Sequence, residues 1–254
     1  MARHAGELLR EWRQRRRLSQ LDLAIQADVS SLHLSFVETG RSRPTSEMIL
    51  RLAEQLEVPL RERNALLLAG GYAPAYPERG LAEPELAAVQ AALKCVLVGH
   101  EPYPAVVVNR CWELVDANRG IAVFTRHVAP ELLEPPANVL RLSLHPDGMA
   151  PRIANLPEWR ARLLARLSRQ IEATGDARLV RLHAELASYP GGEGTRPPAS
   201  DVVVPLRYRS EDGELAFLSI TALVGTPMDI TVAELAIESF YPADAPTAAA
   251  LQKI

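Results

Sequence analysis

The feature that most constrains the fold is the spacing of capping and apolar residues in Leu18–Pro44, LSQLDLAIQADVSSLHLSFVETGRSRP. Ser19 directly precedes Gln20–Ala27, and Ser30 directly precedes Ser31–Glu38. Serine favours the position before a helix because its hydroxyl accepts a hydrogen bond from a backbone N–H of the first turn. Only a tight turn fits between the two segments, so the spacing predicts two short helices that pack against each other.

Individual residues of this segment suit the places where the two helices must meet and end. Ala24 is small enough to lie where the helices cross closely, and Val29 and Leu34 are predicted to anchor the second helix to a core. Gly40 readily adopts the positive φ that a helix stop prefers. Glu38 is expected to hold the loop that follows.

Three further amphipathic segments complete an all-helical domain. Apolar residues recur at helical spacing in Gly6–Arg17, Ser46–Leu56 and Leu60–Ala69. Residues 72–84, YAPAYPERGLAEP, then contain three prolines and one glycine, a composition typical of a linker. We therefore expect an all-α domain of five helices over residues 1–71.

Residues 85–254 mix helices and strands in an order that favours an α+β domain with a five-stranded antiparallel sheet. This order resembles the PAS-like sensor fold, in which helices pack across one face of such a sheet. The predicted helices are Pro84–Val98, Asn118–Phe124, Glu158–Ala173 and Asp176–Ala187, with Pro135–Leu144 helical or irregular. The predicted strands are residues 104–110, residues 111–118, Val202–Arg209, Glu214–Val224 and Ile230–Tyr241, with a hairpin turn at Ser210–Gly213 and a loop over residues 190–200.

Charge is distributed unevenly along the chain, whose net charge is −3. Residues 1–45 carry eight arginines and five acidic residues, a net charge of +3. Residues 81–254 carry sixteen basic and twenty-one acidic residues, a net charge of −5. Because binding to nucleic acid depends on local positive charge, the N-terminal segment is the part suited to a phosphate backbone.

Several classes of protein are excluded by motifs that the sequence lacks. No apolar run reaches the ~18 residues of a membrane span and no apolar signal segment opens the chain, so we expect a cytoplasmic protein without a membrane partner. The histidines have no HExxH spacing, and GxSxG and phosphate-loop motifs are absent, so we expect no enzyme activity and no cofactor. Cys95 and Cys111 lack a metal-binding pattern and are expected to be buried, inert thiols, with a redox switch as the alternative.

The segment Leu18–Pro44 resembles the lambda-repressor-like, or XRE, helix-turn-helix family. The matching residues are the run LSQ, Ala24, Val29-Ser30, Leu34, Glu38, Gly40 and Pro44. In such proteins the second helix of the motif lies in the major groove, and its N-terminal residues read base edges. The resemblance implies a regulator that binds a double-stranded DNA operator. Because one such unit reads only a few base pairs, we expect a homodimer.

The resemblance also implies which side chains contact DNA. Gln20 is implied to contact a phosphate or a neighbouring base, and the N-terminal part of Ser31–Glu38 to face the groove. Leu32 and Phe36 offer only apolar contact, as with a thymine methyl, while His33 is either a hydrogen-bond donor or a plain surface residue. The predicted DNA contacts are Arg17, Gln20, Ser30, Ser31, Leu32, His33, Ser35, Phe36, Arg41 and Arg43, and Arg13, Arg15 and Arg16 are further candidates for phosphates.

A longer stretch, His33–Tyr76, resembles one branch of that family, the regulators with an MmyB-like ligand-binding domain. The match continues in EPYPAVVVNRCWELVDAN and in PPANVLRLSLHPDGMAPRIANLPEW. Members of this branch usually carry Arg before the histidine of the recognition helix. Leu32 takes that place here, so the DNA preference of the branch is not carried over to this chain. The resemblance further implies that residues 85–254 bind a small apolar effector, with a fatty acid as the suspected one.

The ligand is expected between the sheet and the helices near Asn138–Ala173. A carboxylate needs a cation or donors at one end, for which Arg141 is the first candidate and Arg152 the second. The predicted ligand contacts are Asn138, Arg141, His145, Arg152 and Asn155. Apolar strand residues either line a cavity or fill a solid core; they are Val106, Val108, Leu114, Phe217, Leu218 and Ile220. The alternative is a C-terminal domain that only dimerises or binds a protein partner.

Overall fold

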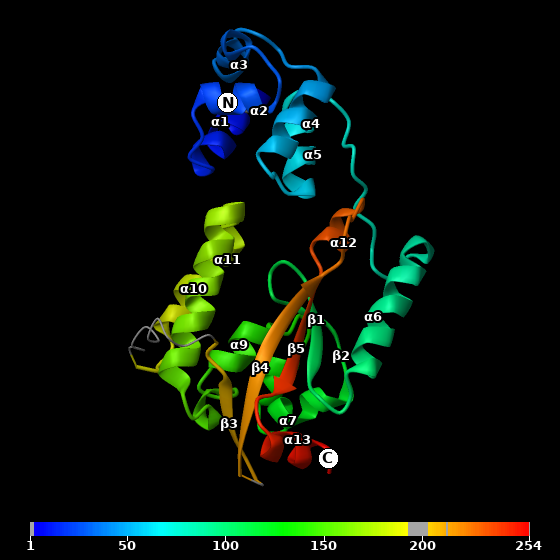
Figure 1. Cartoon of the computed structure of the whole chain (residues 1–254), viewed down its shortest axis with the longest axis vertical. Helices are drawn as coiled ribbons and strands as arrows, with labels where there is room; N and C mark the ends of the chain where they lie inside the picture. Colours follow the sequence, from blue (N-terminus) through cyan, green and yellow to red (C-terminus); the bar gives the residue numbers. More distant parts are fainter. Residues whose placement is uncertain (1–2, 193–202, 212, 254) are drawn as a thin grey trace. The chain divides into compact units, whose positions relative to one another are not determined.

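The computed structural model describes residues 3–192, 203–211 and 213–253. The chain divides into two compact units (Figure 1). The first unit comprises Met1–Arg79, Glu172–Thr174 and Pro227–Ala233. The second unit comprises Gly80–Ile171, Gly175–Thr226 and Glu234–Ile254. Two short segments from the C-terminal half of the sequence therefore fold as parts of the first unit.

Five helices form most of the first unit, which confirms the all-α prediction. Their ends agree with the expected ends to within one or two residues. They are α1 (Ala5–Arg15), α2 (Gln20–Gln26), α3 (Ser31–Glu38), α4 (Ser46–Gln55) and α5 (Leu60–Ala69).

Side-chain caps explain where these helices begin. Ser19 Oγ accepts a hydrogen bond from Asp22 N at 3.1 Å, and the Asp22 carboxylate accepts one from Ser19 N at 3.1 Å. Ser30 caps α3 by accepting from His33 N at 3.4 Å. Each cap satisfies a backbone donor that has no partner inside its own helix. The core behind these caps is apolar, and its fully buried members include Leu9, Leu23, Leu34, Val37, Ile49, Leu52, Leu56 and Leu66.

In its described residues the second unit combines five strands with short and long helices. The strands are β1 (Ala105–Val108), β2 (Leu114–Ala117), β3 (Leu206–Ser210), β4 (Gly213–Leu223) and β5 (Ala236–Pro242). The helices are η1 (Pro84–Leu86), α6 (Ala87–Gly99), η2 (Arg119–Ile121), α7 (Ala122–Thr125), α8 (Pro130–Leu133), α9 (Val139–Leu144), η3 (Ala150–Arg152), α10 (Leu156–Thr174), α11 (Ala177–Ser188) and α13 (Ala245–Leu251). The last residues of α10 and the whole of α12 (Ile230–Ala233) belong to the first unit.

The strands form one antiparallel sheet in the order β2-β1-β5-β4-β3, which confirms the predicted five-stranded sheet. β4 is the longest strand and pairs with both β3 and β5. Its register places Thr221 opposite Glu238 and Ser219 opposite Phe240. Side chains directly opposite on antiparallel strands share one face, so these four point to the same side of the sheet.

Helices cover both faces of this sheet, whereas the sequence suggested helices on one face. Val106 and Val108 of β1 lie in the larger core with apolar residues of α9, α10 and α11. Ala105 and Val107 point to the opposite face and pack with leucines of α6. All four residues of β1 are buried, because a strand between two helical layers has no solvent-facing side (Figure 1).

Part of one predicted strand is wrong. The expected strand Ile230–Tyr241 begins as the short helix α12, and only Ala236–Pro242 is a strand. Asp229 Oδ1 accepts hydrogen bonds from Thr231 N at 2.9 Å and from Val232 N at 3.5 Å, which starts the helical turn. The β-branched residues that suggested a strand are overridden by this cap and by the contacts of α12.

Other expectations need smaller corrections. Helices α8 and α13 were not predicted. Cys95 is exposed rather than buried, while Cys111 is buried. Residues 193–200 of the predicted loop, Val202 of the predicted strand and Asp212 of the predicted turn lie outside the described residues.

Candidate nucleic-acid interface and ligand cavity

Helix α3 buries one side and exposes its N-terminal turn. Leu34 and Val37 are fully buried, so the helix is held firmly from behind. Ser31, Leu32 and His33 are exposed, and Leu32 leaves 62% of its surface in solvent. A helix that enters a major groove needs this geometry, because its first residues must reach the base edges.

The remaining predicted contacts of this region are more varied. Ser35 and Phe36 are half-buried on the next turn of α3. Arg41 is exposed, and its guanidinium carbon lies 6.0 Å from the centre of the Phe36 ring. Arg17 is exposed and has a positive φ of 57° just after the end of α1. Exposed arginines of this kind commonly hold DNA phosphates.

A buried ion pair joins α1, α2 and α3. Arg13 donates to both carboxylate oxygens of Glu38, from Nε at 2.7 Å and from Nη2 at 2.8 Å. Gln20 Nε2 donates to Glu38 Oε2 at 2.7 Å, and Arg13 Nη1 donates to Leu18 O at 2.7 Å. Hydrogen bonding to Glu38 raises the pKa of Arg13 by stabilising its charged form. One carboxylate therefore fixes side chains from two neighbouring helices.

This network corrects two expectations. Arg13 was a candidate for a phosphate contact, but it is only 8% exposed and its donors are engaged inside the unit. Glu38 was expected to hold the loop that follows α3, but its hydrogen bonds reach back to α1 and α2. Gln20 shares this network, and its predicted contact with DNA stays a prediction.

Three other predicted phosphate-binding arginines have partners inside the first unit. Arg43 donates to Gly70 O from Nη2 at 2.7 Å and from Nε at 3.1 Å, which satisfies a carbonyl at the end of α5. Arg16 Nε donates to Leu56 O at 2.9 Å. Arg15 lies over a tryptophan ring, 4.9 Å from its centre. Their contacts with DNA stay predictions, and these intramolecular contacts are roles that the sequence did not indicate.

The second unit contains an apolar cavity between its sheet and helices α7, α9 and α10. About 100 Å³ of it is accessible to the centres of water molecules. A single water needs only about 10–15 Å³ by this measure. The wall includes Val106, Leu114, Phe124, Leu140, Met149 and Leu163. Enclosed cavities lined by apolar side chains accept apolar molecules, and most of this wall is of that kind.

An ion pair interrupts the apolar wall. Arg166 Nη1 donates to the two Glu238 oxygens at 3.1 and 2.9 Å, and Nη2 donates to Thr221 Oγ1 at 2.6 Å. The Arg166 guanidinium carbon also lies 4.3 Å from the centre of the Trp112 ring. The register of β4 and β5 brings Thr221 beside Glu238, so one arginine of α10 reaches both. The two charges neutralise each other within the wall.

A second arginine lies one helical turn earlier on α10. Arg162 Nη2 donates to Ser219 Oγ at 3.0 Å, and its guanidinium carbon lies 5.0 Å from the centre of the Trp159 ring. Arg162 Nη1 is buried and has no hydrogen-bond partner in the described part of the chain. Burial lowers the pKa of Arg162, against the opposing effect of Glu238. Arg162, Arg166 and Glu238 together carry one more positive than negative charge, and we call them the cationic cluster.

The five side chains predicted to contact a ligand lie outside this cavity wall. Asn138 caps α9 by accepting a hydrogen bond from Arg141 N at 3.1 Å, and it donates to Cys111 O at 2.8 Å. Three of the other side chains form hydrogen bonds with backbone groups: His145 with Asp147 N, Arg152 with Arg209 O, and Asn155 with Pro205 O and Arg207 N. His145 Nδ1 also lies 3.7 Å from Asp147 Oδ2. These contacts organise loops and helix ends around the core.

Arg141 lies in a separate, open hollow on the side of α11. About 320 Å³ of this hollow is accessible to the centres of water molecules. It donates to Glu185 from Nε at 2.6 Å and from Nη2 at 2.8 Å, and Tyr189 donates to Glu185 Oε1 at 2.5 Å. The hydrogen bond raises the pKa of Arg141 and lowers the pKa of Glu185. Burial and the bond to Glu185 raise the pKa of Tyr189 to about 12. The charge of Arg141 is therefore balanced by a carboxylate of the protein.

The apolar strand residues divide between cavity, core and surface. Val106 and Leu114 line the cavity. Ile220 is 55% exposed and Leu218 is half-buried, because both lie on the face of β4 opposite to Ser219. The others, Val108 and Phe217, are buried in the core. The two sequence alternatives, a cavity and a core, therefore both occur in one sheet.

The sequence interpretation missed the cationic cluster. On the predicted helix, Trp159, Arg162, Leu163 and Arg166 recur at spacings of three and four residues, which places two arginines beside an apolar stripe. That pattern was a usable signal. Glu238 had no such signal in the sequence, because its position beside Thr221 depends on how β4 and β5 pair.

Two kinds of feature are absent from the described ranges. No cluster of three or more His, Cys, Asp or Glu side chains there is placed to hold a metal ion. No helix in those ranges is both long and apolar enough to cross a membrane.

Known proteins match both parts of the chain. Residues 89–254 match the family described as MmyB-like transcription regulator ligand binding domain, and residues 4–66 match the family described as Helix-turn-helix domain. A curated relative is the "Uncharacterized HTH-type transcriptional regulator RghRB" of Bacillus subtilis (strain 168). It is 38% identical over 74 residues, which are 29% of this chain and 51% of the relative. The chain thus spans about half the length of this curated relative.

Proposed function

The chain belongs to the transcription regulators with an MmyB-like ligand-binding domain, and from this premise we propose a ligand-controlled DNA-binding function. Residues 1–71 bind a DNA operator, residues 72–84 link the domains, and residues 85–254 form a PAS-like domain that dimerises and binds a small apolar or fatty-acyl effector. The observation that carries the proposal is the apolar cavity, whose wall includes Arg166 and Glu238 of the cationic cluster. The exposed first turn of α3 supports the DNA-binding part.

Arg41 and Leu32 are expected to affect DNA binding in different ways. Arg41→Ala should weaken binding to selected and random DNA alike and reduce the dependence of the binding constant on salt, because one phosphate contact is lost. Leu32→Ala should leave the salt dependence unchanged and alter the preference at one base pair. Arg51→Ala on α4, also exposed, is the matched control for a lost surface charge.

These effects are measured by fluorescence anisotropy over a range of salt concentrations, with a duplex selected from a random pool. The same titration gives the stoichiometry, which should be two chains per selected duplex if a homodimer binds two half-sites. Equal effects of Arg41→Ala and Leu32→Ala on selected and random DNA would remove α3 as the reading helix. One chain per duplex would contradict the homodimer.

The cavity suits the hydrocarbon part of an effector. Its wall exposes carbon from strands and from three helices, so an apolar group leaves water without losing hydrogen bonds there. Each buried methylene contributes about 0.8 kcal/mol. Met149 in the wall has an unbranched, flexible side chain that lets the cavity widen along a longer chain.

The cationic cluster suits an anionic head group. Arg166 is already neutralised by Glu238, whereas Arg162 Nη1 is buried and finds no hydrogen-bond partner among the described residues. A carboxylate that accepts from this nitrogen satisfies a costly buried donor and balances the excess positive charge. Arg162 itself is not a lining residue, but it lies one helical turn from Arg166, which is. Arg162 therefore replaces Arg141 as the proposed partner of an acyl carboxylate, because Arg141 is paired with Glu185.

Arg162→Gln is expected to reduce affinity for a fatty acid by about tenfold or more, since a hydrogen bond to a charged group is worth about 1.5–3 kcal/mol. Affinity for the alcohol of equal chain length should change much less. Arg169→Gln is the control, because Arg169 is an exposed arginine of the same helix. The measurement is calorimetry and thermal shift with C8–C18 acids and alcohols.

The outcome also separates the two candidate functions. Equal losses for acid and alcohol in Arg162→Gln would reject Arg162 as the head-group partner. If none of the acids or alcohols raises the melting temperature of the unaltered chain, the effector proposal fails. The second unit is then left with dimerisation or binding of a protein partner as its role.

A further inference from the structure

The connection between β4 and β5 folds as part of the first unit. Pro227–Ala233, which contains α12, is assigned to that unit, although β4 and β5 on either side of it belong to the second. Ile230 and Val232 are buried, and α12 packs against α5. A hairpin loop made only to join two strands would lie on the surface with exposed side chains.

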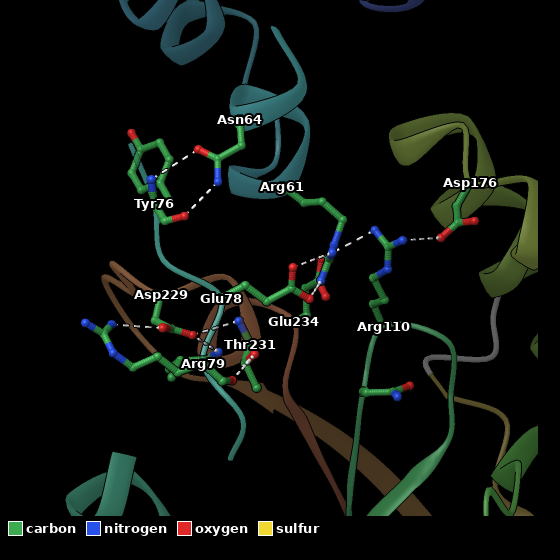
Figure 2. A network of polar contacts seen from close by, with 12 residues as sticks. Arg61, Asn64, Tyr76, Glu78, Arg79, Arg110, Asp176, Asp229, Thr231 and Glu234 are labelled. Carbon is green, nitrogen blue, oxygen red and sulfur yellow. Dashed lines mark hydrogen bonds and ion pairs between the residues drawn. The ribbon is translucent and has the colours of Figure 1, made fainter. Parts of the chain in front are cut away.

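Three polar contacts hold this segment to the chain just before Gly80. Ile230 N donates to Pro77 O at 2.9 Å, and Thr231 Oγ1 donates to Arg79 O at 2.6 Å. Arg79 Nη1 lies 3.2 Å from Asp229 Oδ2, and the Asp229 side chain is only 8% exposed. Figure 2 shows Asp229 and Thr231 both facing Arg79. We call Asp229, Thr231 and Arg79 the latch.

Helix α5 in turn holds the segment of chain that carries Arg79. Asn64 is buried; its Nδ2 donates to Tyr76 O at 2.7 Å, and its Oδ1 accepts from Tyr76 N at 3.1 Å (Figure 2). Arg61 forms an ion pair with Glu78. The predicted linker is therefore anchored over residues 75–79, and the latch extends that anchor to Asp229.

The latch is joined by a short piece of chain to the wall of the cavity. α12 ends at Ala233 and β5 begins at Ala236. β5 carries Glu238 and Phe240, which both line the cavity. Only Glu234 and Leu235 lie between α12 and β5, so a shift of β5 along its axis that exceeds the reach of these two residues moves α12 or breaks the latch.

We propose that the latch couples the cavity wall to the DNA-binding helices, so that a change in β5 and a change in α5 occur together. The inference rests on the proposed function in that it supplies the route by which an effector alters DNA affinity. Coupling of this kind is reciprocal, so DNA must act on β5 as strongly as an effector acts on DNA binding. That reciprocity allows a test with DNA alone.

The test is hydrogen exchange of the full chain, with and without a duplex selected from a random pool. In the unaltered chain DNA should change the exchange rate of residues 236–242 by at least about twofold. This threshold is set below the 5–150-fold change in affinity that is typical of coupled sites. Asp229→Asn and Arg79→Gln should abolish this change. Asp229→Asn keeps an oxygen to cap α12, so helix loss does not confuse the result.

Arg207→Gln is the matched control, because Arg207 forms an exposed ion pair with Glu214 in the second unit. It should retain the full response of residues 236–242 to DNA. The proposal is overturned if DNA leaves β5 unchanged in the unaltered chain, or if the latch variants respond as Arg207→Gln does. A separate arm adds tetradecanoate: a DNA response of β5 without any response to tetradecanoate upholds the latch and rejects the acyl effector.

Discussion

Glu38→Ala is expected to destabilise the first unit by about 3–5 kcal/mol, the usual cost of removing one partner of a buried ion pair. The Glu38 side chain is 1% exposed and accepts hydrogen bonds from Arg13 and Gln20. Alanine leaves the Arg13 charge buried with its Nε and Nη2 donors unpaired. Binding to DNA should fall with stability, because α3 loses its ties to α1 and α2.

The control for Glu38→Ala is Glu11→Ala in the same unit. Glu11 pairs with Arg3, but the two side chains are 48% and 61% exposed, and such pairs contribute less than about 1 kcal/mol. Hydrogen exchange of the α1–α5 amides measures both losses in the full chain. The buried-pair interpretation is wrong if the two variants lose equal stability. The double variant Arg13→Met/Glu38→Leu should regain much of the loss, because it leaves no unpaired buried charge.

Phe124→Ala is expected to destabilise the second unit by about 3–5 kcal/mol, as large-to-small substitutions of buried aromatics do. Phe124 is 2% exposed. Its ring centre lies 5.4 Å from that of Tyr208, 5.0 Å from that of Phe217 and 5.1 Å from that of Phe240, each at a steep angle. Edge-to-face contacts of this kind add to the free energy gained by burial. Because Phe124 also lines the cavity, its truncation should enlarge the space for a ligand.

Tyr241→Ala is the control for Phe124→Ala, since Tyr241 is an aromatic residue of β5 in the same unit and is 40% exposed. Its loss should cost far less, because little apolar surface is removed from the core. Denaturant unfolding of the full chain, followed by hydrogen exchange of β1 and β5, measures both. A loss for Phe124→Ala no greater than that for Tyr241→Ala would contradict the packing argument. A ligand that restores stability to Phe124→Ala would add direct support for the cavity.

The helices of the first unit could be predicted because their signals are local. Ser19 and Ser30 mark helix starts through hydrogen bonds that reach only three residues along the chain. The exposed turn of α3 followed from the same spacing, together with Leu34 facing inward. The partner of Glu38 could not be predicted, because Arg13 lies twenty-five residues away and meets it only after α1 packs on α3.

For the second unit, the sequence predicted the sheet but not the charged residues at the cavity. Five strands and their antiparallel pairing followed from alternating and apolar runs between turn residues. The candidate cations Arg141 and Arg152 were chosen from one unusual segment, but Arg141 meets Glu185 of α11 and Arg152 meets a backbone carbonyl. The cluster at the cavity instead joins α10 with Glu238 of β5.

By itself the sequence determined the helix-turn-helix unit, the α+β class of the second unit and the antiparallel sheet, because caps, turns and periodicity act between residues close in the chain. Tertiary structure alone decided which charges are neutralised, where an apolar core leaves space, and that Ile230–Ala233 is helical and held with Pro77 and Arg79. Those outcomes depend on strand register and on contacts between helices that lie tens of residues apart in the sequence. An arginine has the same chemistry in every context until packing sets its burial and its partner.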